Sequence, residues 1–427
     1  MTDLSTEDFS HKMKDYSFRF VGPVMFEYVS WILNEAQQRK IKRLYFLARD
    51  GYLLREIALK ICETNNIDIE CKYLFCSRQS LRTPSYHLIG DEAYNLLLQW
   101  GYYVTPKSVL ERVGLSAGEQ NALLETLNLE NIALEKKLSK SEFSDFTNKL
   151  RNSDKFKDYV IEKSKSEYPS TINYFKQEGL FAKDYIAVVD SGWSGSMQRS
   201  LRQLMKSAGY NGKFVGFYFG MYSVPKDKED GEYLTFYFNA TKCFSNKLMF
   251  NNNLFECMLS APHPMTVKYE CSNGMVKPVF AKENSKEMNL LIQYQINGAL
   301  EYADWACQKK VDDDYDIKKS QKRCFKLLKR AMVYPKPQEA QMYSCFMFCD
   351  DVTEGYHLSL ADKELRKTLK KNLVIPRIFR KLFGVRDDNT QELLWIYGVI
   401  AFCPPVLRPW YRLNALVWDY LKLILKK

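Results

Sequence analysis

The chain has 427 residues, of which 46% are hydrophobic and 26% charged, and it carries a formal net charge of +11. This composition excludes a disordered or fibrous chain, and the length exceeds one minimal domain. The eleven cysteines are odd in number, scattered and without a Cys-x-x-Cys pair. They favour free thiols in a reducing cytoplasm over a disulfide framework.

The sequence gives little support for a zinc site, a secretory signal or a transmembrane helix. Cys345 and Cys349, with His357 nearby, have a spacing that fits two buried thiols on a helix better than a zinc site. The first 14 residues contain no apolar segment, so no secretory signal is expected. The longest uncharged apolar run, 393–407, spans 15 residues and contains two prolines, which is too short and broken to predict a transmembrane helix.

The first structural unit predicted along the chain is a βαβ unit. Arg49, Asp50 and Gly51 follow its first strand, and Ser77 and Arg78 follow its second. The hydrophobic spacing predicts, in chain order, an amphipathic helix at 24–39, a buried strand at 44–47, a helix at 52–62 and a second strand at 71–76.

Residues 87–180 read as a mainly helical, charged insertion or cap over the sheet. Within it, Ser116 is expected to cap a helix, with Glu119 at the capping-box position. After Gly209, strands are expected at 214–222 and 233–239, strand-like pieces within 267–279, and helices from 288 to 349.

A second strand-loop-helix unit lies between these regions. The apolar run 186–189 predicts a strand that ends in Asp190, and a helix is expected from Gln198 to Ala208. Glycines let the backbone approach a ligand, and a helix start offers unpaired N–H groups to an anion, so this order is typical of phosphate binding. The residues expected to contact the ligand here are Ser191, Gly192, Trp193, Ser194, Gly195, Ser196 and Gln198.

Two such units, each with an acid at the strand end, predict one site at the carboxyl edge of a parallel sheet. A ligand with two phosphate groups and a ribose would use both units. We expect Arg49 and Arg78 to bind a diphosphate, Asp50 to hold Mg²⁺ or its waters, and Asp190 to orient the ribose. Gly51 and Ser77 complete the expected binding residues on this side, with Gly51 supplying flexibility.

The arrangement resembles a type I phosphoribosyltransferase. Residues 188–196 match the signature of that family in order and spacing, and Ala48 to Gly51 match its pyrophosphate loop. The family signature has two adjacent acids, whereas here Ser191 takes the second place, so ribose contacts would rest on Asp190 alone. The resemblance implies phosphoribosyl pyrophosphate as donor, with Mg²⁺.

A second resemblance covers more of the chain. The segments LYFLARDGYLL, CSRQSL, VVDSGWSGSMQ and LFECMLSAPHP are similar to bacterial proteins encoded with surface-polysaccharide (O-antigen or capsule) biosynthesis genes, often labelled haloacid-dehalogenase-like (HAD-like) hydrolases. It implies transfer of a 5-phosphoribosyl unit to a glycan or lipid-linked glycan, after which a separate HAD phosphatase would remove the 5-phosphate. No Asp-x-Asp-x-Thr motif occurs, and the acidic run 312–316 lacks the threonine, so a phosphatase activity of this chain is weakly supported.

Glu256 and His263 lie in the last of these segments, and either is a candidate to accept the proton of an acceptor hydroxyl. The alternative is structural, with Glu256 in a pair or cap and His263 satisfied in its loop. Two roles are also open for Trp193, which would either stack on a sugar or pack against the protein.

Residues 363–427 contain 14 Lys/Arg against 5 Asp/Glu, an excess of nine positive charges, interleaved with aromatic and aliphatic residues. This pattern favours a membrane-interfacial segment, at the inner face of the cytoplasmic membrane, over a nucleic-acid surface. A basic helical subdomain packed on the core is the alternative.

The expected fold is α/β, with a parallel-sheet, phosphoribosyltransferase-like (Rossmann-like) core, a helical insertion and a helical C-terminal region. The expected function is inverting transfer of 5-phosphoribosyl to a glycan with release of pyrophosphate. A sugar-phosphate hydrolase and a non-catalytic assembly protein at the membrane are the alternatives. The expected divisions are 1–85 and 181–285 for the two halves of the core, 86–180 for the insertion, 286–372 for a helical region and 373–427 for the interfacial tail.

Overall fold

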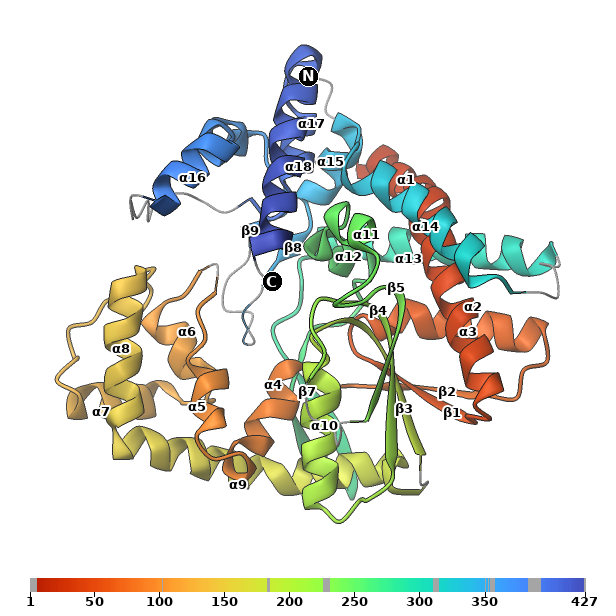
Figure 1. Cartoon of the computed structure of the whole chain (residues 1–427). Helices are drawn as coiled ribbons and strands as arrows, with labels where there is room; N and C mark the ends of the chain where they lie inside the picture. Colours follow the sequence, from red (N-terminus) through yellow and green to blue (C-terminus); the bar gives the residue numbers. More distant parts are fainter. Residues whose placement is uncertain are drawn as a thin grey trace.

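The structure, a computed structural model, describes residues 6–101, 103–182, 185–225, 231–309, 315–349, 351, 353, 358–382 and 393–425. Its centre is a parallel five-stranded sheet in the order β2-β1-β3-β4-β5 (Figure 1). The all-parallel order confirms the expected α/β class. The strands are β1 (Arg43–Leu47), β2 (Glu70–Leu74), β3 (Tyr185–Trp193), β4 (Lys213–Met221) and β5 (Glu232–Phe238).

The strands form where the sequence is apolar on both faces, as parallel sheets require. Every residue of β4 after Lys213 is buried, and so are the last four residues of β1. Alternate side chains of one strand enter two different cores: Phe46 contributes to one, and its neighbours Tyr45 and Leu47 contribute to the other.

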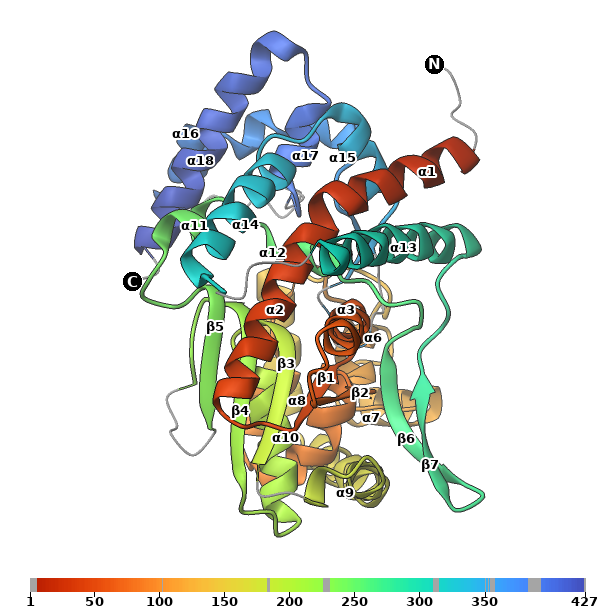
Figure 2. The same ribbon diagram turned by 90° about the vertical axis from the view of Figure 1, so that its right-hand side faces the viewer.

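Helices cover both faces of the sheet (Figure 2). On one face lie α2 (Gly22–Gln38), α3 (Gly51–Thr64) and α13 (Lys286–Gln308), and on the other lie α9 (Asp154–Gln177) and α10 (Ser196–Ser207). The helix after β1 and the helix after β3 therefore go to opposite faces, although β1 and β3 are neighbours. Such a switch point opens a crevice at the carboxyl ends of the two strands.

A helical unit with its own hydrophobic core stands to one side of the sheet (Figure 1). Ser116 and Glu119 form the expected capping box at its α7. Its helices are α5 (Glu92–Leu97), α6 (Pro106–Glu111), α7 (Ala117–Thr126) and α8 (Lys140–Asn152), with the start of α9; α4 (Arg78–Arg82) and the 3-10 turn η2 (Thr83–Leu88) connect it to β2.

The remaining helices gather at the carboxyl end of the sheet and above it (Figure 1). They are α1 (Thr6–Tyr16), α11 (Phe244–Leu248), α12 (Asn252–Met258), α14 (Ile317–Met332), α15 (Pro337–Ser344), α16 (Val374–Leu382), α17 (Ile396–Ala401) and α18 (Arg408–Leu425). Short segments join them: a π-turn at Ser17–Val21, 3-10 turns at Leu180–Ala182, Glu364–Thr368, Lys370–Asn372 and Pro405–Leu407, and the two-residue strands β8 (Met347–Phe348) and β9 (Leu358–Ser359).

The structure gives the form of three regions that the sequence singled out. The strand-like pieces within 267–279 form an antiparallel hairpin, β6 (Thr266–Ser272) and β7 (Met275–Phe280), outside the parallel sheet. The apolar run 393–407 contains α17, which belongs to the core together with the buried Trp395, whose indole N–H donates to the Met332 carbonyl. Val406 and Leu407 at the end of the run are exposed. The interfacial tail expected at 373–427 is therefore interrupted by core residues. No helix among the described residues is long and apolar enough to cross a membrane.

Candidate active site

Three carboxyl groups converge at the switch point. Asp50 follows β1, Asp190 lies in β3 and Glu256 lies in α12, and all three are half-buried. Burial, followed by the charge of Asp50, raises the pKa of Asp190 well above its ordinary value and that of Glu256 to about 7. Burial also raises the pKa of Asp50. The three acids therefore form one electrostatic cluster.

Two arginines complete this cluster. The charges of Arg49 and Arg78 oppose the rise in pKa of Asp50 and of Glu256. Arg78 is exposed at the start of α4, whereas Arg49 directly precedes Asp50. The structure thus brings together five of the predicted residues from four separate segments. A group of both signs suits a ligand that carries phosphates and hydroxyls.

The end of β3 is fixed from both sides. The Ser191 N–H favours the charged form of Asp190 and the buried Ser191 hydroxyl favours that of Asp50, so each opposes the rise in pKa of the acid that it faces. Below them, the Tyr28 hydroxyl lies 2.8 Å from the Asp190 carbonyl oxygen and 2.9 Å from that of Phe217. Ser191 therefore links the two acids instead of facing the ligand alone. Tyr28 was not predicted, because nothing in its helix distinguishes it from a core tyrosine.

The predicted phosphate loop is shorter than expected, because β3 continues beyond Asp190 to Trp193. Gly192 pairs with Gly220 of β4, and a Cβ at Gly192 would lie 2.3 Å from the Gly220 carbonyl oxygen. Gly192 is also at a φ of +121°, which favours glycine. This glycine permits close approach of two strands and not of a ligand to the backbone.

Only Ser194 and Gly195 connect β3 to α10, which begins at Ser196. Gly195 has a φ of +68°, and a Cβ there would lie 2.5 Å from the Tyr233 ring. Ser194 is exposed and Ser196 half-buried beside the first N–H groups of α10. The part of the loop open to an anion is therefore Ser194–Ser196.

Trp193 packs and also orients an acid. Its Nε1–H donates to Oε1 of Glu256 at 2.6 Å, and its ring contacts the rings of Phe250 and Phe255. The structure therefore shows the packing alternative for Trp193. The hydrogen bond stabilises the charged form of Glu256 and fixes where its carboxylate lies.

Two predicted contacts on the β1–β2 side are structural. A Cβ at Gly51 would lie 2.7 Å from the carbonyl carbon of Phe46, so this glycine lets α3 pack closely on β1 and supplies no flexibility. Ser77 caps α4, since its hydroxyl accepts from the Ser80 N–H at 3.1 Å and donates to the Thr266 carbonyl at 2.6 Å.

Gln198 is also a structural residue and not a ligand contact. Its side chain is fully buried, its amide nitrogen donates to the Glu232 carbonyl at 3.3 Å, and its amide oxygen accepts from the Tyr218 hydroxyl at 2.8 Å. The amide joins α10 to the β4–β5 pair.

Both ring nitrogens of His263 are engaged. Nδ1 lies 2.8 Å from the Pro264 carbonyl oxygen and therefore donates to it, and Nε2 lies 2.7 Å from the Tyr73 hydroxyl, from which it accepts. Burial lowers the pKa of His263, which keeps the ring neutral. The structure therefore favours the satisfied loop histidine and leaves Glu256 as the candidate base.

The acids do not form a metal site by themselves. Across the described part of the chain, no group of three or more His, Cys, Asp or Glu side chains is placed to hold a metal ion. The carboxylate oxygens of Asp50 and Asp190 are nevertheless ligands that Mg²⁺ prefers. Burial raises the pKa of both carboxyls, so a nearby cation would stabilise their charged forms. They fit a Mg²⁺ ion that arrives with phosphate oxygens.

The acidic run, the cysteine pair and a separate cavity do not add to the candidate site. Of the acidic run 312–316, residues 312–314 lie outside the described residues, and Asp316 caps α14. His357 also lies outside them, while Cys345 is exposed and not buried as expected. A cavity of about 440 Å³ between α1 and α15 lies apart from the cluster, and its acids Asp15 and Glu339 are paired with arginines.

We compared the chain with protein-family models and with curated proteins. Neither comparison gave a match. The function must therefore be argued from the geometry of the site.

Proposed function

We propose that the protein is a phosphoribosyltransferase-type glycosyltransferase, which moves a 5-phosphoribosyl unit from phosphoribosyl pyrophosphate to a glycan acceptor. The observation that carries this proposal is the convergence of Asp50, Asp190 and Glu256 with Arg49 and Arg78 at the switch point. A resemblance of the sequence to proteins of surface-polysaccharide biosynthesis gives the substrate class.

Each part of the donor has a partner in the cluster. Arg49 and Arg78 bind the diphosphate through paired N–H groups. Asp190, held by Ser191 and Tyr28, orients the ribose hydroxyls and stabilises the positive charge that develops on the ring. The Ser194–Ser196 turn at the start of α10 takes the 5-phosphate.

Asp50 and Asp190 would help to hold Mg²⁺, which supplies charge neutralisation for the diphosphate when bound. The surroundings of these two carboxyls favour such an ion. Burial makes both carboxyls unfavourable as anions in the free protein, and at Asp190 the charge of Asp50 adds to this effect. A Mg²⁺ ion that arrives with the donor would stabilise the charged form of both carboxylates.

Glu256 acts as the general base. With a pKa of about 7, it is partly ionised at neutral pH and basic enough to accept a proton. The acceptor oxygen forms a bond to the anomeric carbon, its proton passes to Glu256, and the bond from that carbon to pyrophosphate breaks. Attack opposite the leaving group inverts the configuration, from an α-linked donor to a β product.

The products separate this proposal from its alternatives. With phosphoribosyl pyrophosphate, Mg²⁺ and a glycan acceptor, we expect pyrophosphate release that depends on the acceptor. Release of inorganic phosphate without acceptor would indicate a sugar-phosphate hydrolase. Asp190→Ala should abolish release, while Asp145→Ala, which removes an exposed acid from α8, should not. Full complementation of a polysaccharide-deficient strain by Asp190→Ala would indicate a non-catalytic assembly protein.

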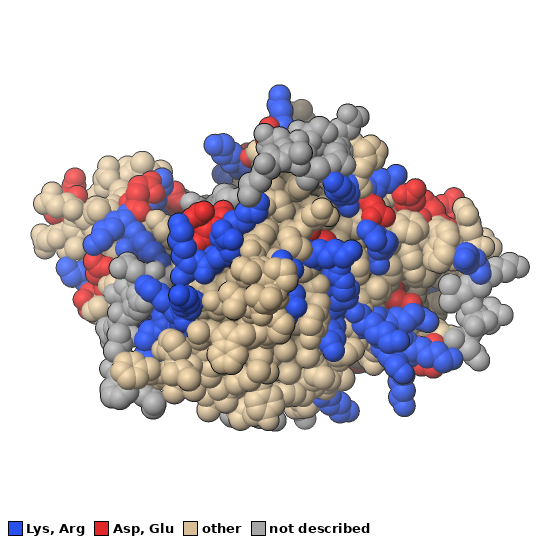
Figure 3. All heavy atoms as spheres, turned by 90° about the horizontal axis from the view of Figure 1, so that it is seen from above, with Lys and Arg blue, Asp and Glu red and all other residues tan. Residues whose placement is uncertain are grey.

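We also propose that α16 and α18 bind the inner face of the cytoplasmic membrane, where a lipid-linked acceptor would lie. Both helices carry exposed apolar stripes at helical spacing: Ile375, Ile378 and Phe379 on α16, and Trp410, Leu413, Val417, Tyr420 and Ile424 on α18. Lys and Arg side chains gather on the face that carries these helices (Figure 3). Apolar stripes flanked by positive charge suit anionic lipid headgroups and the boundary beneath them.

A further inference from the structure

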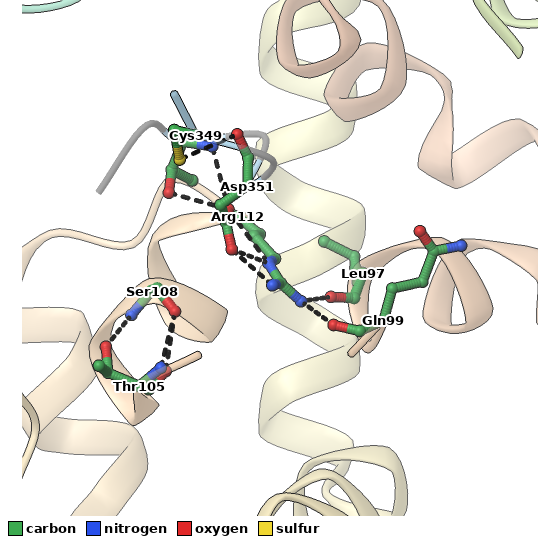
Figure 4. Close-up of polar contacts among 8 residues, drawn as sticks. Leu97, Gln99, Thr105, Ser108, Arg112, Cys349 and Asp351 are labelled. Atoms are coloured by element: carbon green, nitrogen blue, oxygen red, sulfur yellow. Dashed lines mark hydrogen bonds and ion pairs between the residues drawn. The ribbon is translucent and has the colours of Figure 1, made fainter. Parts of the chain in front are cut away.

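Arg82 is a buried arginine without a partner. It ends α4 and is only 8% exposed, and its guanidinium makes no hydrogen bond or ion pair with any described residue. Arg112 shows how this chain normally satisfies such a group. Arg112 is 5% exposed and donates from Nε and Nη2 to Asp351, and from Nη1 to the Leu97 and Gln99 carbonyls (Figure 4).

A buried guanidinium without a counter-charge is costly, so it is expected to serve a ligand or a partner. In the described part of the chain, a few side-chain nitrogen and oxygen atoms are inaccessible to solvent and have no hydrogen-bond partner, and we call these the sealed atoms. No nitrogen of Arg82 is among them. Its guanidinium therefore still borders space that solvent can enter. Sequence reasoning missed Arg82, although its spacing of four residues from Arg78 on one helix could have indicated it.

Tyr86 lies one turn further along the same chain segment, in η2, and has the same property. It is 4% exposed, and its hydroxyl has no hydrogen bond to a described residue and is not among the sealed atoms. Arg78, Arg82 and Tyr86 thus follow one another at intervals of four residues, from the exposed start of α4 into the buried turn. All three can donate hydrogen bonds.

The charge around Arg82 is positive. Burial, and next the charge of Arg78, lower the pKa of Arg82 to about 10, and Arg112 acts in the same direction. The charge of Arg112 is matched by Asp351, and no acid is among the groups whose charge shifts the pKa of Arg82. Glu167 of α9 acts on Tyr86 instead. The positive charge around Arg82 therefore favours binding of an anion.

The position of these residues relates them to the candidate active site. Arg78 belongs to the carboxylate cluster, whereas Arg82 and Tyr86 lie away from it, where α4 and η2 pack against α10. The charge of Arg78 acts on both Glu256 and Arg82, so Arg78 links the cluster to the buried arginine.

We propose that Arg78, Arg82 and Tyr86 form an anion subsite that binds a phosphate group of a substrate, beside the carboxylate cluster. The identity of that substrate rests on the proposed function. The phosphate belongs either to the donor or to the diphosphate of a lipid-linked acceptor, and both present the same chemistry to the arginines.

Binding of inorganic pyrophosphate and of inorganic phosphate to the full-length protein, measured by titration calorimetry, tests the subsite without turnover. Arg82→Gln should weaken binding about 10- to 100-fold, because a hydrogen bond to a charged group is lost. Tyr86→Phe should weaken it about 2- to 10-fold. Arg151→Gln, which removes a charge from α8, should leave the affinity unchanged. Unchanged affinity in Arg82→Gln would overturn the subsite.

Thermal unfolding separates a ligand-binding role from a structural one. Arg82→Met removes an unpartnered buried charge, so the ligand-free variant should melt at or above the wild-type temperature. It should also lose the stabilisation that pyrophosphate gives the wild type. A lower melting temperature with an undiminished pyrophosphate effect would assign Arg82 to the core and overturn the proposal.

Kinetics then identify the source of the phosphate. Arg82→Gln should raise KM for phosphoribosyl pyrophosphate if the donor supplies it, or KM for a lipid diphosphate-linked glycan if the acceptor does. If the wild type shows no transferase activity but Arg82→Gln still loses pyrophosphate binding, the subsite is retained and the proposed function is rejected. If Arg82→Gln binds pyrophosphate normally, with normal KM values and intact transfer, the proposed function is retained and the subsite is rejected.

Discussion

The indole Nε1–H of Trp193 donates a hydrogen bond of 2.6 Å to Oε1 of Glu256. This contact joins the last residue of β3 to α12, two segments more than 60 positions apart in the chain. Aromatic contacts hold the indole ring, so the ring in turn holds the carboxylate. The position of the candidate base therefore depends on a side chain only three residues after Asp190.

Trp193→Phe should keep most of the ring packing and remove this donor. Because the hydrogen bond favours the ionised carboxylate, its loss should raise the pKa of Glu256 further. We expect the acid limb of the rate profile to move about one pH unit higher, since each unit corresponds to about 1.4 kcal/mol. kcat should fall more than KM changes. Trp100→Phe, at an exposed tryptophan, is the control, and an acid limb unmoved in Trp193→Phe would reject the positioning role.

Asp50→Asn should move the same limb in the opposite direction. The charge of Asp50 is the second largest cause, after burial, of the raised pKa of Glu256. Removing that charge should let Glu256 ionise at lower pH. Activity will also fall, so the measurement is the pH dependence of the residual rate or the titration of Glu256 by NMR. A pKa of Glu256 that stays near 7 in Asp50→Asn would contradict the shared cluster.

Glu256→Gln should change stability in a pH-dependent way. The pKa of Glu256 is about 7 in the folded protein and about 4.5 when exposed, so the folded state binds the extra proton between these values. Its contribution to stability is complete below pH 4.5 and is lost as the pH rises through 7. The glutamine variant should therefore melt higher than wild type at pH 8 and almost equally at pH 4.5. Glu283→Gln at an exposed position should show neither effect, and equal melting of Glu256→Gln and wild type at pH 8 would exclude an ionised buried acid.

The buried pair of Arg112 and Asp351 should matter for folding and not for chemistry. Asp351 pairs with Arg112 and also accepts from the N–H and hydroxyl of Thr353 at 3.1 Å. Asp351→Ala leaves a buried arginine without a counter-charge and should cost about 3–5 kcal/mol of unfolding free energy. Denaturant unfolding measures this. Adding Arg112→Met to Asp351→Ala should recover part of the loss, whereas a further loss would contradict this account.

Membrane binding is tested with surface substitutions on α18. Truncation before Trp395 is unsuitable, because that residue and α17 are part of the core. Trp410→Ser with Leu413→Ser should weaken binding to anionic phospholipid vesicles at least about tenfold, since both side chains are exposed and available for insertion. Leu290→Ser on α13 is the control. Undiminished vesicle binding by the double variant would exclude α18 as the contact.

The sequence predicted most of the core. Strands β1, β3 and β4 are continuous apolar runs, and α2 and α3 have hydrophobic residues at helical spacing, so period and length alone located them. The sequence placed Asp50 and Asp190 at one edge of the sheet because the carboxyl ends of parallel strands share that edge, although β3 continues for three residues beyond Asp190.

What the sequence did not reveal depends on contacts between distant segments. Ser191, Gly192 and Trp193 look like a loop, yet two of them pair with Gly220 and Met221 of β4. The burial of Arg82 likewise arises only when α4 packs against α10. The hydrogen bonds of Gln198 arise only when α10 packs on β4 and β5. Residue type and spacing do not encode which polar groups are already satisfied.

The most direct test of the central claim is a structure of the full-length Glu256→Gln variant with phosphoribosyl pyrophosphate and Mg²⁺. We predict the diphosphate beside Arg49 and Arg78, the ribose hydroxyls at Asp190 and the 5-phosphate at Ser194–Ser196. A donor bound elsewhere in the molecule, with Asp50 and Asp190 untouched, would contradict the assignment of this cluster as the active site.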